Sequence, residues 1–125
     1  MKHTFATCLS CIDGRVQIPT IHWIQENYHV DYVDMITEVG IDGVLSADSY
    51  EIDDIIKRTK CSIEFHNSNL IFVVGHYDCA GNPVDEETHK KQIGLAVTRL
   101  QQLDMPCKII GLWVSDKWQV ETIED

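Results

Sequence analysis

Two hydrophobic patterns alternate along the chain. Short runs that are apolar or β-branched almost throughout are typical of strands covered on both faces, whereas apolar residues recurring every three or four positions predict helices. A final segment, residues 118–123, follows a turn at 115–117 and predicts an edge strand that returns as a hairpin. The preceding strand-like runs span residues 4–9, 32–39, 70–75 and 108–114.

Each gap between these runs contains a helical pattern. The first helix is expected to begin near Pro19, because proline suits the first helical turn. The second takes Ser46 or Ser49 as its N-cap. The third takes Asn82 as its N-cap and Pro83 as its first helical residue. This alternation predicts an α/β fold: a mainly parallel central sheet of about four strands plus an antiparallel edge strand, with helices on its faces.

Composition and charge are typical of a globular protein with a single domain over residues 1–125. Hydrophobic residues make up 44% of the sequence, and 125 residues suffice for one core. The 20 acidic and 10 basic residues give a formal net charge of -10, which disfavours nucleic acid and anionic membranes as partners because both need a basic face. Neither a signal-peptide core nor a membrane-spanning apolar stretch of about 18 residues is found, so we expect a cytoplasmic protein.

Two short clusters carry the candidate chemistry. One, CIDGR at residues 11–15, follows the first predicted strand, and the other, HYDC at residues 76–79, follows the third. Functional groups gather beyond the carboxyl ends of parallel strands, so the clusters are expected to meet. Cys11, His76 and Cys79 then offer two thiolates and one imidazole, which suit zinc and leave its fourth tetrahedral position open. Because catalytic zinc sites keep such a position, the pattern favours a metal hydrolase or hydratase.

Asp13 and Arg15 alternate with Cys11 in the first cluster. A carboxylate near zinc either binds the metal or accepts a hydrogen bond from metal-bound water. Arg15 can decide between the two, because its guanidinium grips a carboxylate bidentately and holds it off the metal. The simpler alternative is a structural ion pair that closes the loop.

The paired motifs resemble the signature of the β-class carbonic anhydrases, Cys-x-Asp-x-Arg after one strand and His-x-x-Cys after another. The similarity extends over residues 62–81 and, more weakly, over the final hairpin. The resemblance implies Zn2+ bound by Cys11, His76 and Cys79, with Asp13 and Arg15 as the catalytic dyad that gates the open position. It also implies hydration of carbon dioxide to bicarbonate by a metal-bound hydroxide, in a homodimer or higher homo-oligomer.

Several alternatives stay open at this point. Relatives of that family hydrolyse carbonyl sulfide or carbon disulfide with the same ligands, and a catalytically inactive zinc-binding homologue would keep Asp13 on the metal permanently. Typical family members are also longer and carry N-terminal helices that embrace the partner subunit. In addition, Cys8 and Cys11 form a C-x-x-C string that could suggest a redox pair, although positions three apart on a strand face opposite sides of the sheet.

Three other groups of residues are given structural roles. Cys61 lies in an apolar context and is expected to be a packing residue. His89, like the other histidines outside the second cluster, has no ligand-like spacing and is expected at the surface or in packing. Trp113 and Trp118 flank the last turn and are predicted to form a cross-strand aromatic contact.

Overall fold

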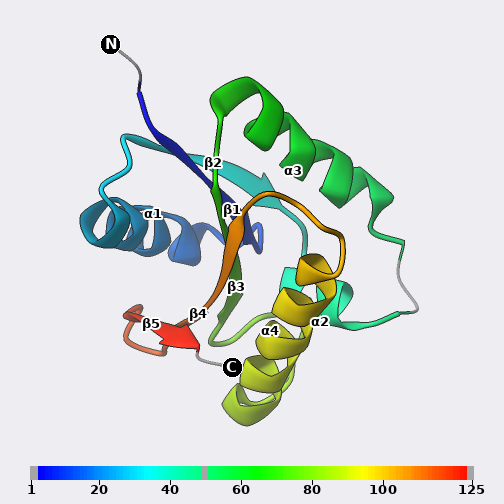
Figure 1. The fold of residues 1–125 in the computed structure, drawn as a ribbon. Helices are drawn as coiled ribbons and strands as arrows, with labels where there is room; N and C mark the ends of the chain where they lie inside the picture. The colour runs from blue at the N-terminus through cyan, green and yellow to red at the C-terminus, as the bar shows by residue number, and fades with distance from the viewer. Residues whose placement is uncertain (1–2, 49–50, 124–125) are drawn as a thin grey trace.

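The computed structural model describes residues 3–48 and 51–123, and its centre is a five-stranded sheet with the strand order β2-β1-β3-β4-β5 (Figure 1). The first four strands are parallel, and β5 runs antiparallel to β4. The predicted α/β fold is therefore confirmed. The strands span Phe5–Ser10 (β1), Tyr32–Thr37 (β2), Leu70–His76 (β3), Lys108–Val114 (β4) and Val120–Ile123 (β5).

Helices cover both faces of this sheet. Helix α1 lies on one face, and α2, α3 and α4 lie on the other (Figure 1). Leu9 and Val73 pack on the side of the three helices, whereas Cys8 and Phe72 pack on the side of α1. Successive strand residues point to opposite faces, which explains why the central strands are apolar almost throughout. The helices span Gly14–Tyr28 (α1), Ile41–Ser46 (α2), Asp53–His66 (α3) and Glu86–Gln101 (α4).

Helix α1 begins earlier than predicted. Asp13 is its N-cap, and the Asp13 carboxylate accepts a hydrogen bond from the backbone N–H of Arg15 at 2.9 Å. Pro19 therefore lies inside the helix, not in its first turn as predicted. The capping carboxylate satisfies a free N–H at the helix start, and this starts the helix five residues before the proline.

The segment between β2 and β3 also differs from the prediction. The short helix α2 lies before the predicted start of the second helix, and Ser46 ends α2 instead of capping a longer helix. Ser49, the other predicted cap, lies outside the described residues. Helix α3 begins at Asp53 without a side-chain cap, so local capping chemistry does not set its start.

Helix α4 starts three residues after the predicted position. Its N-cap is Asp85, whose carboxylate accepts the backbone N–H of Thr88 at 2.8 Å. The predicted cap, Asn82, is buried and directs its side-chain amide to Asp42 instead. The last strand begins at Val120, after Trp118 in the connecting turn. None of the helices within the described ranges has the length and apolar character needed to cross a bilayer.

Candidate metal centre

The two sequence clusters meet at one edge of the sheet. Strands β1 and β3 are parallel neighbours, with Leu9 opposite Val73. Cys11 directly follows β1, His76 ends β3, and Cys79 lies three residues further on. All three side chains are buried, and one ligand atom from each lies within 4.8 Å of the others. The structure therefore brings together the three residues that the sequence nominated as metal ligands.

The His76 imidazole has the lone pair of its Nε2 atom available for a metal ion. Its Nδ1 lies 2.8 Å from the carbonyl oxygen of Tyr77. A carbonyl only accepts, so Nδ1 carries the proton and Nε2 is left with its lone pair. Nε2 is buried and has no hydrogen-bond partner among the described residues. Because an unpaired buried polar atom is costly, a metal ion at Nε2 would remove an existing penalty.

The two cysteine sulfurs are spaced for a shared metal. The Cys11 and Cys79 Sγ atoms lie 4.0 Å apart, and both thiols are free. Burial, together with the neighbouring Cys11, raises the pKa of Cys79 to about 11. A divalent cation reverses both effects, because it stabilises thiolates and separates their charges. The donor set of two sulfurs and one imidazole nitrogen fits Zn2+ with one position open.

Backbone N–H groups near Cys79 partly offset the rise in its pKa. Hydrogen bonds from the backbone N–H groups of Asn82 and Gly81 act to lower the pKa of Cys79. A helix capped by Asn82, as predicted, would have placed its free N–H groups here, but α4 does not begin until Glu86. Loop amides take that role because Asn82 does not cap the helix.

Asp13 and Arg15 form a bidentate pair next to this cluster. Arg15 Nη2 lies 2.7 Å from Asp13 Oδ2, and Arg15 Nε lies 3.1 Å from Asp13 Oδ1. The hydrogen bond from Arg15 is the largest cause that lowers the pKa of Asp13 to about 2. The carboxylate is therefore fixed twice, by this guanidinium and by its capping bond to α1.

Arg15 also reaches across to the second cluster. Its Nη1 lies 3.2 Å from Asp78 Oδ2, and its Nη2 lies 3.1 Å from the Asp78 carbonyl oxygen. The Arg15 guanidinium carbon stands 4.8 Å from the ring centroid of Trp118. The predicted contact between Trp113 and Trp118 is wrong, because Trp113 lies against His89 and Trp118 against Arg15. No sequence pattern links a tryptophan in the last hairpin to an arginine in the first loop.

A buried polar network lies beside the second cluster, residues 76–79, and supports its backbone. Asp42 Oδ1 accepts a hydrogen bond from the Asn82 amide at 3.0 Å, and Asp42 Oδ2 lies 2.5 Å from His89 Nδ1. The Asn82 amide also donates to Gln92 at 2.7 Å. A Cβ at Gly75 would lie 2.5 Å from Asp42 Oδ2, so the backbone before His76 passes directly over this carboxylate. Sequence analysis missed this network, because its members are far apart along the chain and follow no motif.

The C-x-x-C string does not pair two reactive thiols at Cys8 and Cys11. Cys8 is fully buried, and desolvation raises the pKa of its thiol to about 12, so it is not a reactive thiolate. Cys61 is exposed, not a packing residue as predicted. The sulfur near Cys11 is that of Cys79 rather than that of a C-x-x-C partner.

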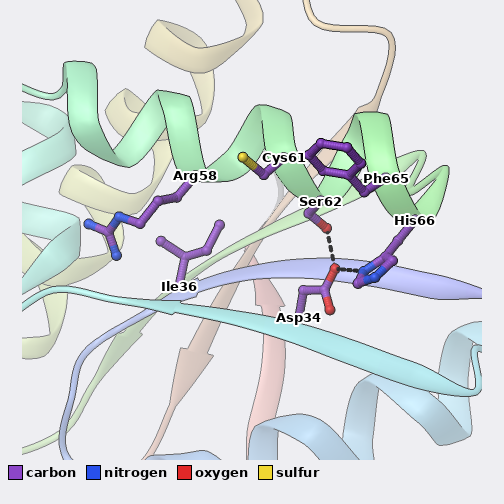
Figure 2. A pocket seen from close by; sticks show the side chains of 7 residues that line it. All are labelled: Asp34, Ile36, Arg58, Cys61, Ser62, Phe65 and His66. Carbon is purple, nitrogen blue, oxygen red and sulfur yellow. Dashed lines mark hydrogen bonds and ion pairs between the residues drawn. The ribbon is translucent and has the colours of Figure 1, made fainter.

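Two hollows lie near these elements. One, of about 500 Å3, borders the second cluster and is lined in part by Tyr77, Cys79 and Trp113. The other, of about 280 Å3, lies between β2 and α3, where Asp34 accepts a hydrogen bond from Ser62 and contacts His66 (Figure 2). None of the three candidate ligands lines this second hollow, so it is separate from the metal centre.

Comparison with known proteins supports the fold and gives a matching family model. A family model described as "Putative carbonic anhydrase" matches residues 1–124. Beta-carbonic anhydrase isoform I from Trichomonas vaginalis superposes with a TM-score of 0.63 at 17% identity, covering 95% of this chain and 82% of that chain. No curated protein sequence matches the chain significantly.

Two further solved structures have the same fold. Carbonic anhydrase from Streptococcus mutans has a TM-score of 0.65 at 14% identity, covering 98% of this chain and 84% of that chain. A tetrameric beta-carbonic anhydrase from Sordaria macrospora has a TM-score of 0.60 at 11% identity, covering 100% of this chain and 83% of that chain.

Proposed function

The chain belongs to the family described as "Putative carbonic anhydrase", and from this premise we propose that it hydrates carbon dioxide to bicarbonate at a zinc ion held by Cys11, His76 and Cys79. The main support is the convergence of these three buried side chains, whose ligand atoms lie within 4.8 Å of one another. Zinc, when bound, supplies a Lewis acid that makes water a nucleophile at neutral pH.

The other residues of the site then have defined tasks. Asp13 stays ionised, because its pKa is lowered to about 2, and its carboxylate accepts a hydrogen bond from the attacking water. Arg15 donates to both oxygens of Asp13 and so keeps the carboxylate from taking the open coordination position. The Tyr77 carbonyl holds the His76 imidazole in the tautomer that a metal needs.

The same site is also compatible with two alternative functions, which the experiment must distinguish. Carbonyl sulfide and carbon disulfide are linear electrophiles like carbon dioxide and would use the same three ligands. A zinc-binding protein without activity would keep Asp13 on the metal at every pH. We place the protein in the cytoplasm, as the sequence predicts.

We also propose that the protein forms a homo-oligomer, as a homodimer or a larger assembly. Exposed apolar side chains flank the metal loops, with Ile12 57% and Tyr77 48% exposed. The Sordaria relatives are tetramers, which supports assembly through surfaces of this fold. Sedimentation velocity over a range of protein concentrations would test this, and a monomer at all concentrations would contradict it.

The deciding experiment measures metal and activity on one sample. Freshly purified protein is expected to hold about one zinc per chain, the stoichiometry of a single three-ligand site, and to accelerate carbon dioxide hydration in stopped-flow assays. Cys79→Ser should lose both the metal and the activity, whereas Asp13→Asn should keep the metal and hydrate carbon dioxide more slowly. Rates on carbonyl sulfide and carbon disulfide, measured in parallel, identify the preferred substrate.

Cys61→Ser is the matched control, because Cys61 is an exposed thiol outside the cluster. It should keep both metal and rate. Full activity of Asp13→Asn would contradict the proposed gate. Stoichiometric zinc without activity on any of the three gases would favour the inactive homologue.

A further inference from the structure

Arg15 is held by two residues whose backbones adopt an unusual conformation. Among the described residues, five that are not glycine have positive φ: His29, Asn67, Asp78, Asp104 and Trp118. Three of these lie at or just after the ends of helices, where the left-handed conformation is common. The other two, Asp78 and Trp118, both have φ of 57°, and both contact Arg15.

The position of Trp118 would ordinarily suit glycine. It ends the turn between β4 and β5, where its N–H donates to the Ser115 carbonyl at 2.9 Å. Ser115 in turn donates its N–H to the Gln119 carbonyl at 2.9 Å. Hairpin loops of this length place a residue in the left-handed region, and a bulky side chain there costs free energy. Strain of this kind persists where the surrounding structure holds the residue in place.

Two contacts hold the indole of Trp118. Its ring packs on the apolar cluster under α1. Its other contact is the Arg15 guanidinium, 4.8 Å from the ring centroid. The guanidinium donates its hydrogen bonds to Asp13 and Asp78 in its own plane. An indole that meets the face of the guanidinium would therefore restrain it without competing with the ion pairs.

We propose that Trp118 is a positioning residue for the Asp13–Arg15 pair. The indole fixes the plane of the Arg15 guanidinium, and the fixed guanidinium keeps the Asp13 carboxylate away from the open coordination position. This inference rests on the proposed function, in which Asp13 and the open position compete. It makes the C-terminal hairpin part of the site, through a contact between residues 103 positions apart in sequence.

Substitutions at Trp118 can test the contribution of the aromatic face of the indole separately from the contribution of its volume. Trp118→Leu keeps apolar packing but removes the π face, whereas Trp118→Phe keeps both in part. Trp118→Met is a second apolar replacement, in case leucine is not accepted in the turn. The matched control is Trp23→Leu, because Trp23 packs on the same apolar cluster but lies against Tyr28 rather than Arg15.

The first measurement uses protein loaded with Co2+, whose visible spectrum distinguishes a carboxylate from water in the open position. Azide titrated at fixed pH reports how much of the site is open. Trp118→Leu is expected to lower the ratio of open to carboxylate-bound sites about two- to fivefold, the effect of a half-exposed cation–π contact. Trp118→Phe and Trp23→Leu should stay close to the wild-type ratio.

The second measurement needs no metal. In the apo protein, the Arg15 Nε–H should exchange with solvent faster in Trp118→Leu than in the wild type or in Trp23→Leu. Unchanged exchange and an unchanged cobalt spectrum in Trp118→Leu and Trp118→Met would overturn the inference. An equal change in Trp23→Leu would also overturn it, since general packing would then be the cause.

Asp13→Asn distinguishes this failure from failure of the proposed function. If Asp13→Asn changes the cobalt spectrum and Trp118→Leu does not, the Asp13 gate stands and the role of Trp118 is wrong. If Asp13→Asn leaves the spectrum and the azide affinity unchanged, the gate itself is wrong, and Trp118 has nothing to position.

Discussion

His76 illustrates how one residue is prepared for a metal by its neighbours. The Tyr77 carbonyl fixes the proton on Nδ1, and burial leaves Nε2 without a partner among the described residues. The backbone before it passes over the Asp42 carboxylate, where only glycine fits. The position of the imidazole therefore depends on Gly75 as much as on the histidine itself.

Gly75→Ala should disturb both stability and metal binding. The added Cβ would lie 2.5 Å from Asp42 Oδ2 and 2.8 Å from the Ile93 side chain. Overpacking of this kind costs about 1–3 kcal/mol, because buried neighbours must shift. Denaturant unfolding of the apo protein would give the loss of stability, and competition with a chelator would give the expected weakening of zinc binding.

Gly94→Ala is the control for this substitution. Apart from its chain neighbours and the backbone of its own helix, α4, no atom of the described residues lies within 4 Å of a Cβ built at Gly94. Alanine is the better helix former, so this variant should be more stable by roughly 0.5–1 kcal/mol. Equal behaviour of the two variants would show that the contact between Gly75 and Asp42 does not constrain the loop.

At the scale of elements, the start of α4 makes stability depend on pH. Hydrogen bonds from Thr88, through its side chain and its backbone N–H, lower the pKa of Asp85 below its ordinary value of 3.8. The folded state therefore holds this proton less tightly than the unfolded state. The contribution of Asp85 is complete above pH 3.8 and is lost as the pH falls through the lower folded value.

Asp85→Ala should consequently be less stable than the wild type near neutral pH, and this difference should shrink in acid. Asp85→Asn is the useful comparison, since an asparagine can cap the helix without titrating. Thermal unfolding from pH 7 down to pH 2.5 would measure all three proteins. A difference between wild type and Asp85→Ala that is the same at every pH would contradict the assigned cap.

Element boundaries were harder to predict from the sequence than element types. Pro19 and Asn82 carry ordinary signals for a helix start, yet Asp13 and Asp85 are the caps that the structure uses. Asn82 is drawn into the core by Asp42, forty positions away, and no local pattern reveals such a partner. The strands were predictable because burial on both faces leaves a continuous apolar run in each.

Some residues of the candidate site could likewise be predicted from the sequence, whereas others could not. Cys11 follows β1 and His76 ends β3, and these strands are parallel neighbours, so the approach of the two residues could be inferred from strand order. Trp118 and Asp42 reach the site through contacts that only the folded chain creates. Motif residues are thus readable from sequence, whereas the residues that hold them in place are not.

At the scale of the whole molecule, the metal would link two segments that are distant along the chain and meet only because their strands are neighbours in the sheet. Cys11 belongs to the loop after β1, and His76 and Cys79 belong to the end of β3 and the loop after it. Without a metal, the site holds a His76 Nε2 that has no partner in the described part of the chain and a Cys79 thiol with a raised pKa. Binding should therefore stabilise the entire fold, since the unfolded chain has no such site.

Removing zinc should lower the free energy of unfolding. A ligand present at a thousandfold excess over its dissociation constant stabilises the folded state by about 4 kcal/mol. The unfolding midpoint of the wild type and of Cys61→Ser should fall when a strong chelator is added, and it should recover when zinc is restored. Cys79→Ser should unfold at the same midpoint with and without chelator. A wild-type midpoint that responds to neither treatment would mean that the loops after β1 and β3 meet without a metal between them.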